Sequence, residues 1–505
     1  MADRLDPDGR AVKVGPITVR TPGLAGTATL RTPGDGGTRG PEAGTPELRE
    51  ALQQADAREQ YTLELTGLSE TPAARGGARG RSSGAPGATG ARGAAEEIEI
   101  EVPAPAKDEG QVLLHIAEDG VATWHVPEQV AASEGVQRGR RMLVYRVPAT
   151  LAPVAPDASA TPTAPTRGIV STIASKVLKF IVFPLLDPLL KKAGNHFATA
   201  FEDKRRFQRW RSFTPDDYRT DDARTLDRAA WARLAEGPSL LFVHGTGAMA
   251  HNAFALSPDV FERLSRRYGG RVFALDHHSL SISPRRNVEI AAADVPVDLD
   301  FEVDIVSHSR GGLVARELAE RGEEAGLPPG FRVRTVVMAG TPNAGTALAQ
   351  RSNISTWLDT ITNIAQFVPD NPVADILAVA LTVAKHVATG VFEGLEGVTS
   401  MDPDGDYLKK LNVDAAVTAR YVAIAADFEP VDGTPLRRVH DLAIDTLFSG
   451  AANDLVVPTA GVAQVAGLGR FAPASLVLDA TQGVDHSSFF TTDRVVTELL
   501  ARLPG

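Results

Sequence analysis

The chain of 505 residues is too long for a single hydrophobic core, so we expect two or three folded units joined by linkers. Asp and Glu (63) outnumber Lys and Arg (52), and the formal net charge of −11 argues against a nucleic-acid-binding protein. Cysteine is absent, which excludes disulfide frameworks and thiolate metal sites. No secretory signal is visible at the N-terminus, so we expect a cytoplasmic location, with export by a signal-independent route left open.

The first 96 residues are predicted to be mostly disordered or of low complexity. Residues 1–47 are rich in Gly, Pro, Thr and Arg with little apolar periodicity, and residues 67–95 are a run rich in Gly, Ala and Arg. The segment 48–64 between them is compatible with a short helix. The arginines of the second run could contact a polyanion, but a solvated linker is the favoured interpretation.

Residues 97–147 are predicted to form a small β module. Apolar and acidic residues alternate with period two over residues 97–102, and two apolar runs flank a turn sequence, EDG, at residues 118–120. We expect this module to bind or dock to a partner, which the sequence does not identify.

Residues 148–166 are predicted to be a linker rich in Pro, Ala and Thr, followed by a helical connector over residues 167–236. The apolar stretch 169–190 contains lysines and prolines that argue against a membrane-spanning helix. We expect it to pack on the following domain. Peripheral contact with a membrane surface is the alternative, since lysines beside aromatic residues suit an interface. The charged run 202–211 is predicted to be a solvated face.

The rest of the chain, residues 237–505, alternates apolar strands with helical stretches. Six strands are predicted, at residues 240–247, 271–276, 303–306, 333–339, 420–426 and 475–479. Continuously apolar strands separated by helices indicate an α/β fold with a mostly parallel sheet covered on both faces. Functional sites in such sheets lie at the carboxyl ends of the strands, where His244 and Ser309 are expected.

Ser309 lies in a stretch, VDIVSHSRGGLV, that predicts a strand, a tight turn and a helix. A serine on such a bend exposes its hydroxyl above the sheet, and small neighbours are needed where the two backbones come close. Gly311 and Gly312 meet this need, while Ser307 stands where a glycine is usual. Taken alone, the stretch is equally compatible with an ordinary strand-to-helix junction that has a capping serine.

Two later segments, SGAANDLVVP and VDHSSF, supply the partners that a serine nucleophile needs. A base must take the hydroxyl proton, and an acid must fix the tautomer of that base and stabilise its charged form. Asp454 alone would fit a turn, and His486 alone would fit a capped surface position. Their joint occurrence in the order Ser309, Asp454, His486 favours a catalytic triad, with Asp427 and Asp445 as competitors for the acid.

Roughly residues 238–500 resemble the α/β-hydrolase superfamily, and its lipase-like branch in particular. The resemblance rests on the sequences LLFVHGTG, VDIVSHSRGGLVAREL, VVMAGTPNAGT, NDLVVP and VDHSSFF. It implies that Ser309 is the nucleophile, Asp454 the acid and His486 the base. It also implies an α/β-hydrolase domain over residues 237–505.

The resemblance further implies an oxyanion hole made by the backbone amides of Thr246 and Arg310, which would stabilise the negative oxygen of a tetrahedral intermediate. No cofactor or metal is expected. Residues 402–406 (DPDGD) lack the terminal glutamate of a calcium-binding loop and predict a turn. The adjacent histidines of the 276–278 sequence would point in opposite directions on a strand end, which argues against a joint metal site.

Residues 347–400 are predicted to be a helical insertion between two strands, because apolar residues recur there twice at helical spacing. The helices could simply be buried on the domain, or they could form a lid whose inner face lines an acyl pocket, and these alternatives are compatible. The position matches that of the lid in lipase-like enzymes, so we favour a lid. Trp357 and Phe367 are the expected substrate-binding residues.

These observations predict a serine esterase or lipase that cleaves carboxylic esters, lipid or other acyl esters above all, through an acyl-enzyme on Ser309. One alternative is a catalytically silent hydrolase fold that serves as an interaction module. Another is a phospholipase-type effector that acts at a membrane, which follows from the apolar stretch 169–190 and the lid. The presence of all three triad residue types favours catalysis.

Overall fold

The computed structural model describes most of the chain, in segments separated by gaps. The described residues are 2–33, 45–70, 97–117, 120–128, 136–137, 140–149, 175–185, 196–364, 373–392, 394–413, 418–430, 444–465 and 474–504. They form two compact units: a β unit from residues 1–43 and 56–185, and an α/β unit from residues 44–55 and 186–505.

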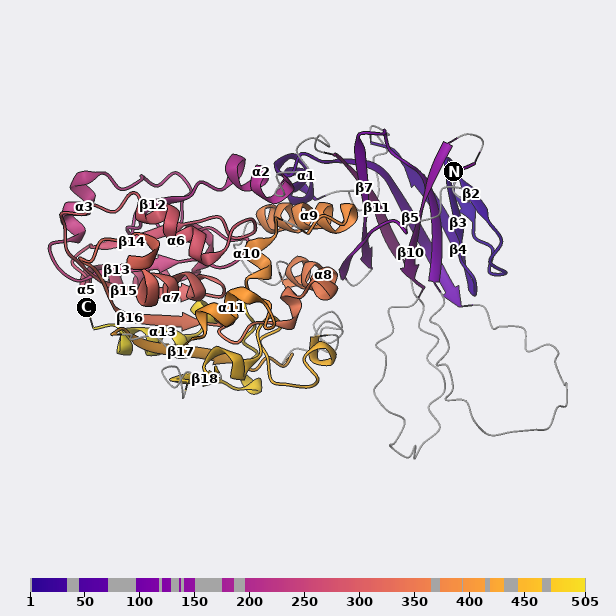
Figure 1. Ribbon diagram of the computed structural model, residues 1–505. Coiled ribbons are helices and arrows are strands. Elements are labelled where there is room, and N and C mark those ends of the chain that lie inside the picture. Colours follow the sequence, from indigo (N-terminus) through magenta and orange to yellow (C-terminus); the bar gives the residue numbers. More distant parts are fainter. Residues whose placement is uncertain are drawn as a thin grey trace, which may run out of the picture. The chain divides into compact units, whose positions relative to one another are not determined.

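The β unit consists of two antiparallel sheets (Figure 1). One has the strand order β1-β4-β5-β11-β7-β8 and the other has the order β2-β3-β6-β10-β9. The strands are β1 (Asp3–Arg4), β2 (Val12–Val14), β3 (Ile17–Arg20), β4 (Leu24–Arg31), β5 (Arg58–Glu70), β6 (Glu97–Pro103), β7 (Glu109–Ala117), β8 (Ala122–His125), β9 (Val136–Gln137), β10 (Arg140–Pro148) and β11 (Ser175–Pro184). Side chains from both sheets form one hydrophobic core, to which Val19, Leu63, Ile100, Tyr145 and Phe180 belong.

The prediction of a mostly disordered segment over residues 1–96 and a separate β module over residues 97–147 is therefore wrong. Five strands precede residue 71, and their partners lie far along the chain: Val19 pairs with Ile100, and Leu63 pairs with Leu178. A core built from such long-range pairs leaves little local signal in any one strand. The low-complexity run 67–95 after residue 70, and the predicted linker 148–166 after residue 149, lie outside the described residues.

The expected helix and the membrane contact within residues 169–190 are also corrected. Residues 175–184 form β11, a central strand between β5 and β7. Both lysines of this strand are buried, and Lys179 Nζ lies 3.0 Å from Glu59 Oε2. The continuous apolar run reflects a strand covered on both faces, so it is not a surface available to a membrane. No helix among the described residues has the length and apolarity needed to cross a bilayer.

The α/β unit is built on a seven-stranded sheet with the order β12-β14-β13-β15-β16-β17-β18. Its strands are β12 (Arg209–Ser212), β13 (Ser239–Val243), β14 (Val272–Asp276), β15 (Phe301–His308), β16 (Phe331–Ala339), β17 (Arg420–Ala426) and β18 (Leu476–Leu478). All neighbours are parallel except β12, which pairs antiparallel with β14. The expected α/β fold is thus confirmed.

Helices accompany this sheet (Figure 1). They are α1 (Pro46–Gln54), α2 (His196–Arg205), α3 (Arg228–Leu234), α4 (Ala250–Ala253), α5 (Pro258–Arg267), α6 (Pro284–Ala292), α7 (Gly311–Arg321), α8 (Ile354–Ile364), α9 (Val373–Thr389), α10 (Glu396–Thr399), α11 (Asp406–Leu411) and α13 (Asp493–Arg502). Ser257 and Ser283 cap α5 and α6, each followed by a proline at the first helical position, which sharpens these helix starts.

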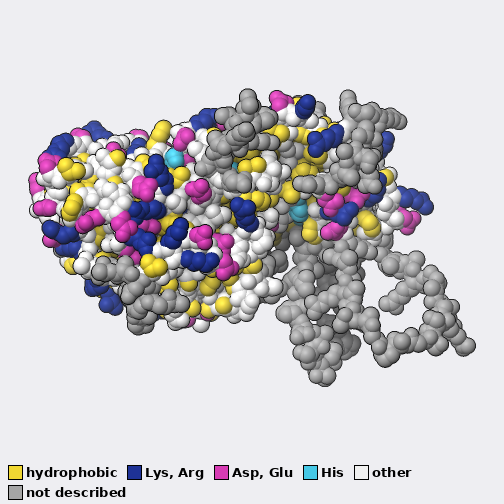
Figure 2. Space-filling view, in the orientation of Figure 1, with side chains coloured by type: hydrophobic (Ala, Val, Ile, Leu, Met, Phe, Trp, Pro, Cys, Tyr) yellow, Lys and Arg dark blue, Asp and Glu magenta, His cyan; other side chains and the backbone are white. Residues whose placement is uncertain are grey.

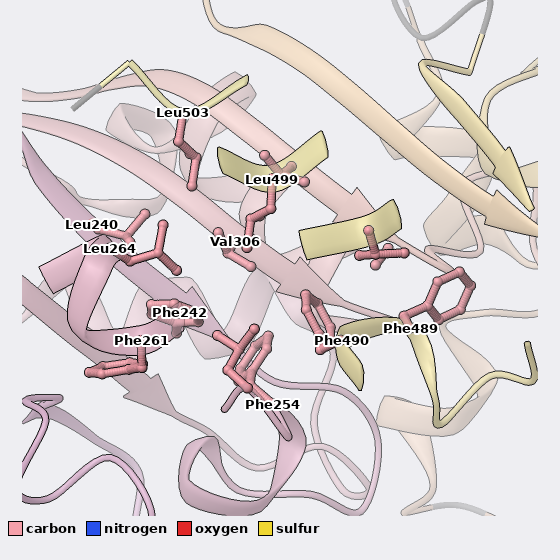
Figure 3. Close-up of a cluster of buried hydrophobic side chains, with 14 of the residues drawn as sticks. Leu240, Phe242, Phe254, Phe261, Leu264, Val306, Phe489, Phe490, Leu499 and Leu503 are labelled. Carbon is pink, nitrogen blue, oxygen red and sulfur yellow. The ribbon is translucent and has the colours of Figure 1, made fainter. Parts of the chain in front are cut away.

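The core of the α/β unit joins the sheet to α5 and α13. Leu240, Phe242 and Val306 of the sheet pack with Phe261 of α5 and Leu499 of α13, and Figure 3 shows these side chains converging. Helix α7 contacts β13, β15 and β16. On the face seen in Figure 2, acidic and basic side chains are interspersed over this unit, with no broad basic surface.

The predicted helical connector over residues 167–236 is replaced by β11, α2, β12 and α3. The charged run 202–211 within it is a solvated face only in part: residues 203–205 are exposed, but Glu202, Arg206 and Arg211 are buried. Arg211 lies in β12 and is surrounded by the carbonyl oxygens of Asp217 and Thr220, which accept hydrogen bonds from its guanidinium. Charged residues are buried here because each finds polar partners.

The insertion after β16 contains α8 and α9, which pack against each other. Helix α9 also contacts α1 and α2. Although α1 lies between β4 and β5 in the sequence, it belongs to the α/β unit, where Gln54 Nε2 donates to Asp375 Oδ1 of α9 at 2.9 Å.

Candidate active site

Ser309 lies on a sharp bend between β15 and α7. Its φ of +54° is in the left-handed region, which few residues other than glycine adopt. The next two glycines are required by close backbone approach: a Cβ on Gly311 would lie 2.3 Å from the Val243 carbonyl oxygen, and a Cβ on Gly312 would lie 2.0 Å from Thr341 Oγ1. The sequence therefore permits a bend that raises the Ser309 side chain above the carboxyl end of the sheet.

The structure brings together the three side chains that the sequence singled out. Ser309 Oγ lies 2.8 Å from His486 Nε2, and His486 Nδ1 lies 2.8 Å from Asp454 Oδ2. Because the carboxylate only accepts hydrogen bonds, Nδ1 carries a proton, and Nε2 of a neutral ring is free to accept the serine proton. All three residues are buried.

Asp454 is held in place by its own turn. Its Oδ1 accepts hydrogen bonds from the amides of Val456 (3.0 Å) and Val457 (2.7 Å), so that Oδ2 faces the imidazole. The Asp454 carbonyl oxygen also accepts the His486 amide at 2.9 Å, which fixes the two segments to each other. Of the two competing acids, Asp445 accepts a hydrogen bond from Asn453 Nδ2 instead.

Gly245 brings the loop after β13 against Ser309. A Cβ at this position would lie 2.8 Å from Ser309 Cβ, so only glycine permits the approach. His244 Nδ1 donates to the Gly245 carbonyl oxygen at 2.9 Å, and its Nε2 accepts the His277 amide at 3.0 Å. Both bonds require a neutral ring, and burial lowers the pKa of His244 to about 4.

Arg310 directly follows Ser309 in the sequence, and Thr246 lines the same cavity as Ser309. Within the described part of the chain, neither amide donates a hydrogen bond to the protein. The Arg310 side chain extends away from the serine and is buried, where it donates to the carbonyl oxygens of Gly397 and Ile282 and to Asn287 Oδ1. This anchoring holds the residue after Ser309 without placing a cation in the site.

His308 precedes the serine and packs against His486, with ring centroids 4.9 Å apart. Its Nε2 lies 2.8 Å from the His486 carbonyl oxygen and must donate to it, since a carbonyl oxygen only accepts. Burial and the neighbouring His486 lower the pKa of His308 to about 3, so the ring is neutral near pH 7. His308 thus supports the backbone of His486 without adding charge beside it.

A cavity of about 140 Å³ opens beside Ser309 and His486. Its wall is largely apolar and is formed by α8, α9 and the loop after β13; the lining includes Trp357, Ile361, Ile364, Ile376, Val379 and Ala253. Of the two predicted substrate-binding residues, Trp357 lines the cavity and Phe367 lies outside the described residues. Asn252 and Met401 also line it, and no periodicity or motif in the sequence indicated them; Val456, from the NDLVVP motif, lines it as well.

Two further residues near the loop after β13 were missed by sequence reasoning. Ser279 Oγ accepts the Gly247 amide at 2.8 Å, and Glu202 accepts hydrogen bonds from the segment that contains Ser279. Glu202 is part of a charged run, which normally indicates solvent exposure, so the sequence carries no signal for its burial. In the described ranges no group of three or more His, Asp or Glu residues is arranged to hold a metal ion.

Comparison with solved structures finds bacterial lipases and esterases similar to about half of this chain. Lipase BlEst2 of Bacillus licheniformis in mature form is 16% identical, with 53% of this chain and 93% of that chain covered and a TM-score of 0.33. Lipase 1 of Pelosinus fermentans is 14% identical, with 53% and 99% covered and a TM-score of 0.37. EstA of Clostridium botulinum is 12% identical, with 53% and 88% covered and a TM-score of 0.38.

No protein of curated function matches the sequence. Residues 205–504, more than half of the chain and nearly all of the α/β unit after α2, match a single protein family. The chain therefore belongs to the family described as a domain of unknown function, DUF7379.

Proposed function

We propose that the protein is a serine hydrolase that cleaves carboxylic esters through an acyl-enzyme on Ser309. The observation that carries the proposal is the continuous hydrogen-bond chain from Ser309 Oγ through His486 to Asp454, with both links at 2.8 Å. A hydroxyl is a weak nucleophile near neutral pH and is activated by a base that is itself oriented by an acid. The left-handed backbone of Ser309 supports the same role.

In the first half of the reaction, Ser309 Oγ attacks the acyl carbon and its proton passes to His486 Nε2. Asp454 stabilises the resulting imidazolium through Nδ1. The tetrahedral intermediate collapses when the bond from the acyl carbon to the alcohol oxygen breaks, and the alcohol leaves with the proton from His486. In the second half, a water gives its proton to His486 and attacks the acyl-enzyme, which releases the carboxylic acid and restores Ser309.

The amides of Thr246 and Arg310 are the proposed donors to the negative oxygen of the intermediate. Support comes from the position of Arg310 directly after Ser309, from the presence of Thr246 in the lining of the same cavity, and from the lack of a protein acceptor for either amide in the described chain. The loss of one such donor costs about 3 kcal/mol of transition-state stabilisation in other hydrolases.

The acyl group of the substrate is proposed to lie in the cavity beneath α8 and α9, which act as a lid. Support comes from the apolar side chains that line it, Trp357, Ile361 and Val379 among them. Each methylene that leaves water is stabilised by about 0.8 kcal/mol, so lipid or other acyl esters with medium or long chains fit this wall better than acetate does.

The test compares wild type with Ser309→Ala for hydrolysis of p-nitrophenyl esters and for labelling by a fluorophosphonate probe. We expect Ser309→Ala to lose labelling and at least about 10⁴-fold in kcat, because no other group replaces the nucleophile. Ser307→Ala is the matched control: its Oγ donates to the Val337 carbonyl oxygen, away from the cavity, so activity should persist.

Two results would contradict the proposal. Near-wild-type hydrolysis by Ser309→Ala would show that another residue is the nucleophile. A folded wild-type protein that neither reacts with the probe nor hydrolyses any acyl ester would instead favour an interaction module built on a hydrolase fold. If instead wild type hydrolyses esters and Ser309→Ala does not, lipid profiling with the two proteins would identify the natural acyl ester, a phospholipid included.

A further inference from the structure

The loop from His244 to Gly247 is fixed by hydrogen bonds from two sides. A peptide unit is planar, so a bond to either its C=O or its N–H group orients both. His244 Nδ1 donates to the Gly245 carbonyl oxygen, and this peptide plane contains the Thr246 N–H group. The next plane contains the Gly247 N–H group, which donates to Ser279 Oγ at 2.8 Å. Both planes adjacent to Thr246 are thus held by side chains.

Ser279 is itself held by a buried carboxylate. Glu202 Oε1 accepts the amides of Ser279 (2.6 Å) and Leu280 (2.8 Å), and Glu202 Oε2 accepts the amide and the hydroxyl of Ser281 at 3.0 and 2.5 Å. The Glu202 side chain is only 1% exposed, so these four bonds replace the water that its charge would otherwise require. The segment after β14 is thereby fixed to α2.

The oxyanion loop needs this support because its backbone is unusual and tightly packed. Gly247 has a φ of +73°, and a Cβ there would lie 3.0 Å from Val379 Cγ1 of α9. No secondary structure holds the loop, since residues 244–249 lie between β13 and α4. Without the Ser279 bond, the peptide that follows Thr246 could rotate, and the loop that carries the Thr246 amide would be held on one side only, by the His244 bond to the Gly245 carbonyl oxygen.

We infer that Ser279 is a positioning residue for the oxyanion hole: it holds the peptide plane that follows Thr246 through the Gly247 amide, while Glu202 holds Ser279 in place. The inference rests on the proposed ester hydrolysis by Ser309. Preorganised donors aimed at the developing charge account for a large part of the rate of such reactions. Ser279 touches neither the substrate nor the reacting atoms, and its effect on the rate passes through the position of the loop that carries the Thr246 amide.

The experiment measures kcat and KM on a short p-nitrophenyl ester and Ki for a trifluoromethyl ketone, whose adduct with Ser309 places a negative oxygen in the hole. Ser279→Ala should lower kcat about tenfold and raise Ki by a similar factor, because both depend on the oxyanion donors, whereas KM should stay unchanged. Ser279→Cys keeps nearly the same volume with a weaker acceptor, so it should shift kcat and Ki in the same direction if the alanine variant does not fold.

Ser283→Ala is the matched control. Ser283 Oγ also accepts a backbone amide, that of Arg286 at 3.3 Å, but it caps α6 and does not reach the oxyanion loop. This variant should lose stability, by thermal melting, without a change in kcat or Ki. The comparison of Ser283→Ala with Ser279→Ala therefore separates the loss of stability caused by removing any serine-to-amide hydrogen bond in this segment from a specific effect on the oxyanion hole.

The outcomes distinguish the inference from the proposed function. If wild type hydrolyses esters and Ser279→Ala keeps wild-type kcat and Ki, or loses no more than Ser283→Ala, Ser279 is not a positioning residue. If Ser279→Ala raises KM with kcat unchanged, its role is in substrate binding and the inference is wrong. If wild type itself neither hydrolyses esters nor binds the ketone, the proposed function has failed.

Discussion

Ser309, His486 and Asp454 show how local backbone and side-chain chemistry fix one another at the scale of single residues. Ser309 adopts a left-handed conformation that costs of order 1–3 kcal/mol, which the surrounding packing must offset. The residues that permit it are Gly245, whose Cα faces Ser309, and Gly311, which lies against the end of β13. The bend could be predicted from the sequence because its strained backbone restricts which residues fit at the serine and glycine positions.

Asp454 offers a sharp test of the proposed base. In Asp454→Asn, the Val456 and Val457 amides still require an oxygen acceptor at the Oδ1 position, so the new NH₂ group points at His486 Nδ1. The imidazole must then carry its proton on Nε2 and can no longer accept the serine proton. We expect kcat to fall by about 10³- to 10⁴-fold with the fold intact, as measured on a p-nitrophenyl ester.

Asp445→Asn is the control for this prediction, because Asp445 was the other acidic candidate in the same loop and its Oδ1 accepts a hydrogen bond from Asn453. Its rate should remain near that of wild type. A large loss in Asp445→Asn together with a small loss in Asp454→Asn would reverse the assignment of the acid.

At the scale of elements, a strand could be predicted from the sequence where its own run of apolar residues indicates burial. The strands from β13 to β18 are rich in apolar residues and alternate with helical stretches, and most of their predicted bounds lie within a few residues of the observed ones. The strands of the β unit were missed because their partners are distant: β5 pairs with β11, more than 100 residues later. Strand β11 was misassigned because the burial of Lys176 and Lys179 depends on those partners.

In the candidate site, too, residues in local motifs could be predicted from the sequence, whereas residues that depend on distant partners could not. The triad residues lie in motifs whose spacing relative to strands is visible in the sequence. The supporting residues Glu202 and Ser279 act through contacts between segments about 77 residues apart, and nothing local marks either of them. Long-range polar contacts of this kind are set by the tertiary structure alone.

The lid helices lead to a prediction about acyl length. Ile361 of α8 lines the cavity, so Ile361→Trp should fill part of it and exclude the end of a long chain. Loss of two or three buried methylenes corresponds to about 2 kcal/mol, or some thirtyfold in kcat/KM for a dodecanoate ester, with little change for acetate. The measurement is kcat/KM across a series of p-nitrophenyl esters from acetate to dodecanoate.

Ile290→Trp serves as the matched control for the lid, since Ile290 is a partly exposed residue of α6 that does not line the cavity. Its chain-length profile should equal that of wild type. An unchanged profile in Ile361→Trp would show that α8 only packs on the domain and does not contact the acyl chain.

At the scale of the whole molecule, the chain passes between the two units after residues 43, 55 and 185. The helices that follow the first and last of these crossings, α1 and α2, both pack on α9. Lys385 of α9 donates to the carbonyl oxygen of Ala55 at the end of α1, and His386 Nε2 accepts the Ala198 amide at the start of α2. Helix α9, on which α1 and α2 pack, also lines the cavity with Ile376 and Val379.

The β unit should lose stability in acid because of two buried histidines. His115 lies 3.5 Å from Lys176 Nζ, and burial together with this lysine lowers the pKa of His115 to about 3 and that of His125 to about 4. In the unfolded chain both titrate near 6.5, so the unfolded state binds more protons between pH 6.5 and these lower values. The free energy of unfolding is therefore highest above pH 6.5. As pH falls from 6.5 to the folded-state pKa, it decreases by about 1.4 kcal/mol per pH unit for each histidine.

Native-state hydrogen exchange of β7 and β8, corrected for the intrinsic rate, measures this effect in the full chain at pH 7 and pH 5. Protection should be markedly lower at pH 5 in wild type, and the double variant His115→Gln/His125→Gln should show a smaller difference because neither glutamine titrates. Equal opening free energies at the two pH values in wild type would contradict this prediction, because they would mean that the pKa values of His115 and His125 are the same in the folded and unfolded states. The same comparison at β13 and β15 reports on His244 and His308, whose lowered pKa values predict loss of stability over a similar pH range.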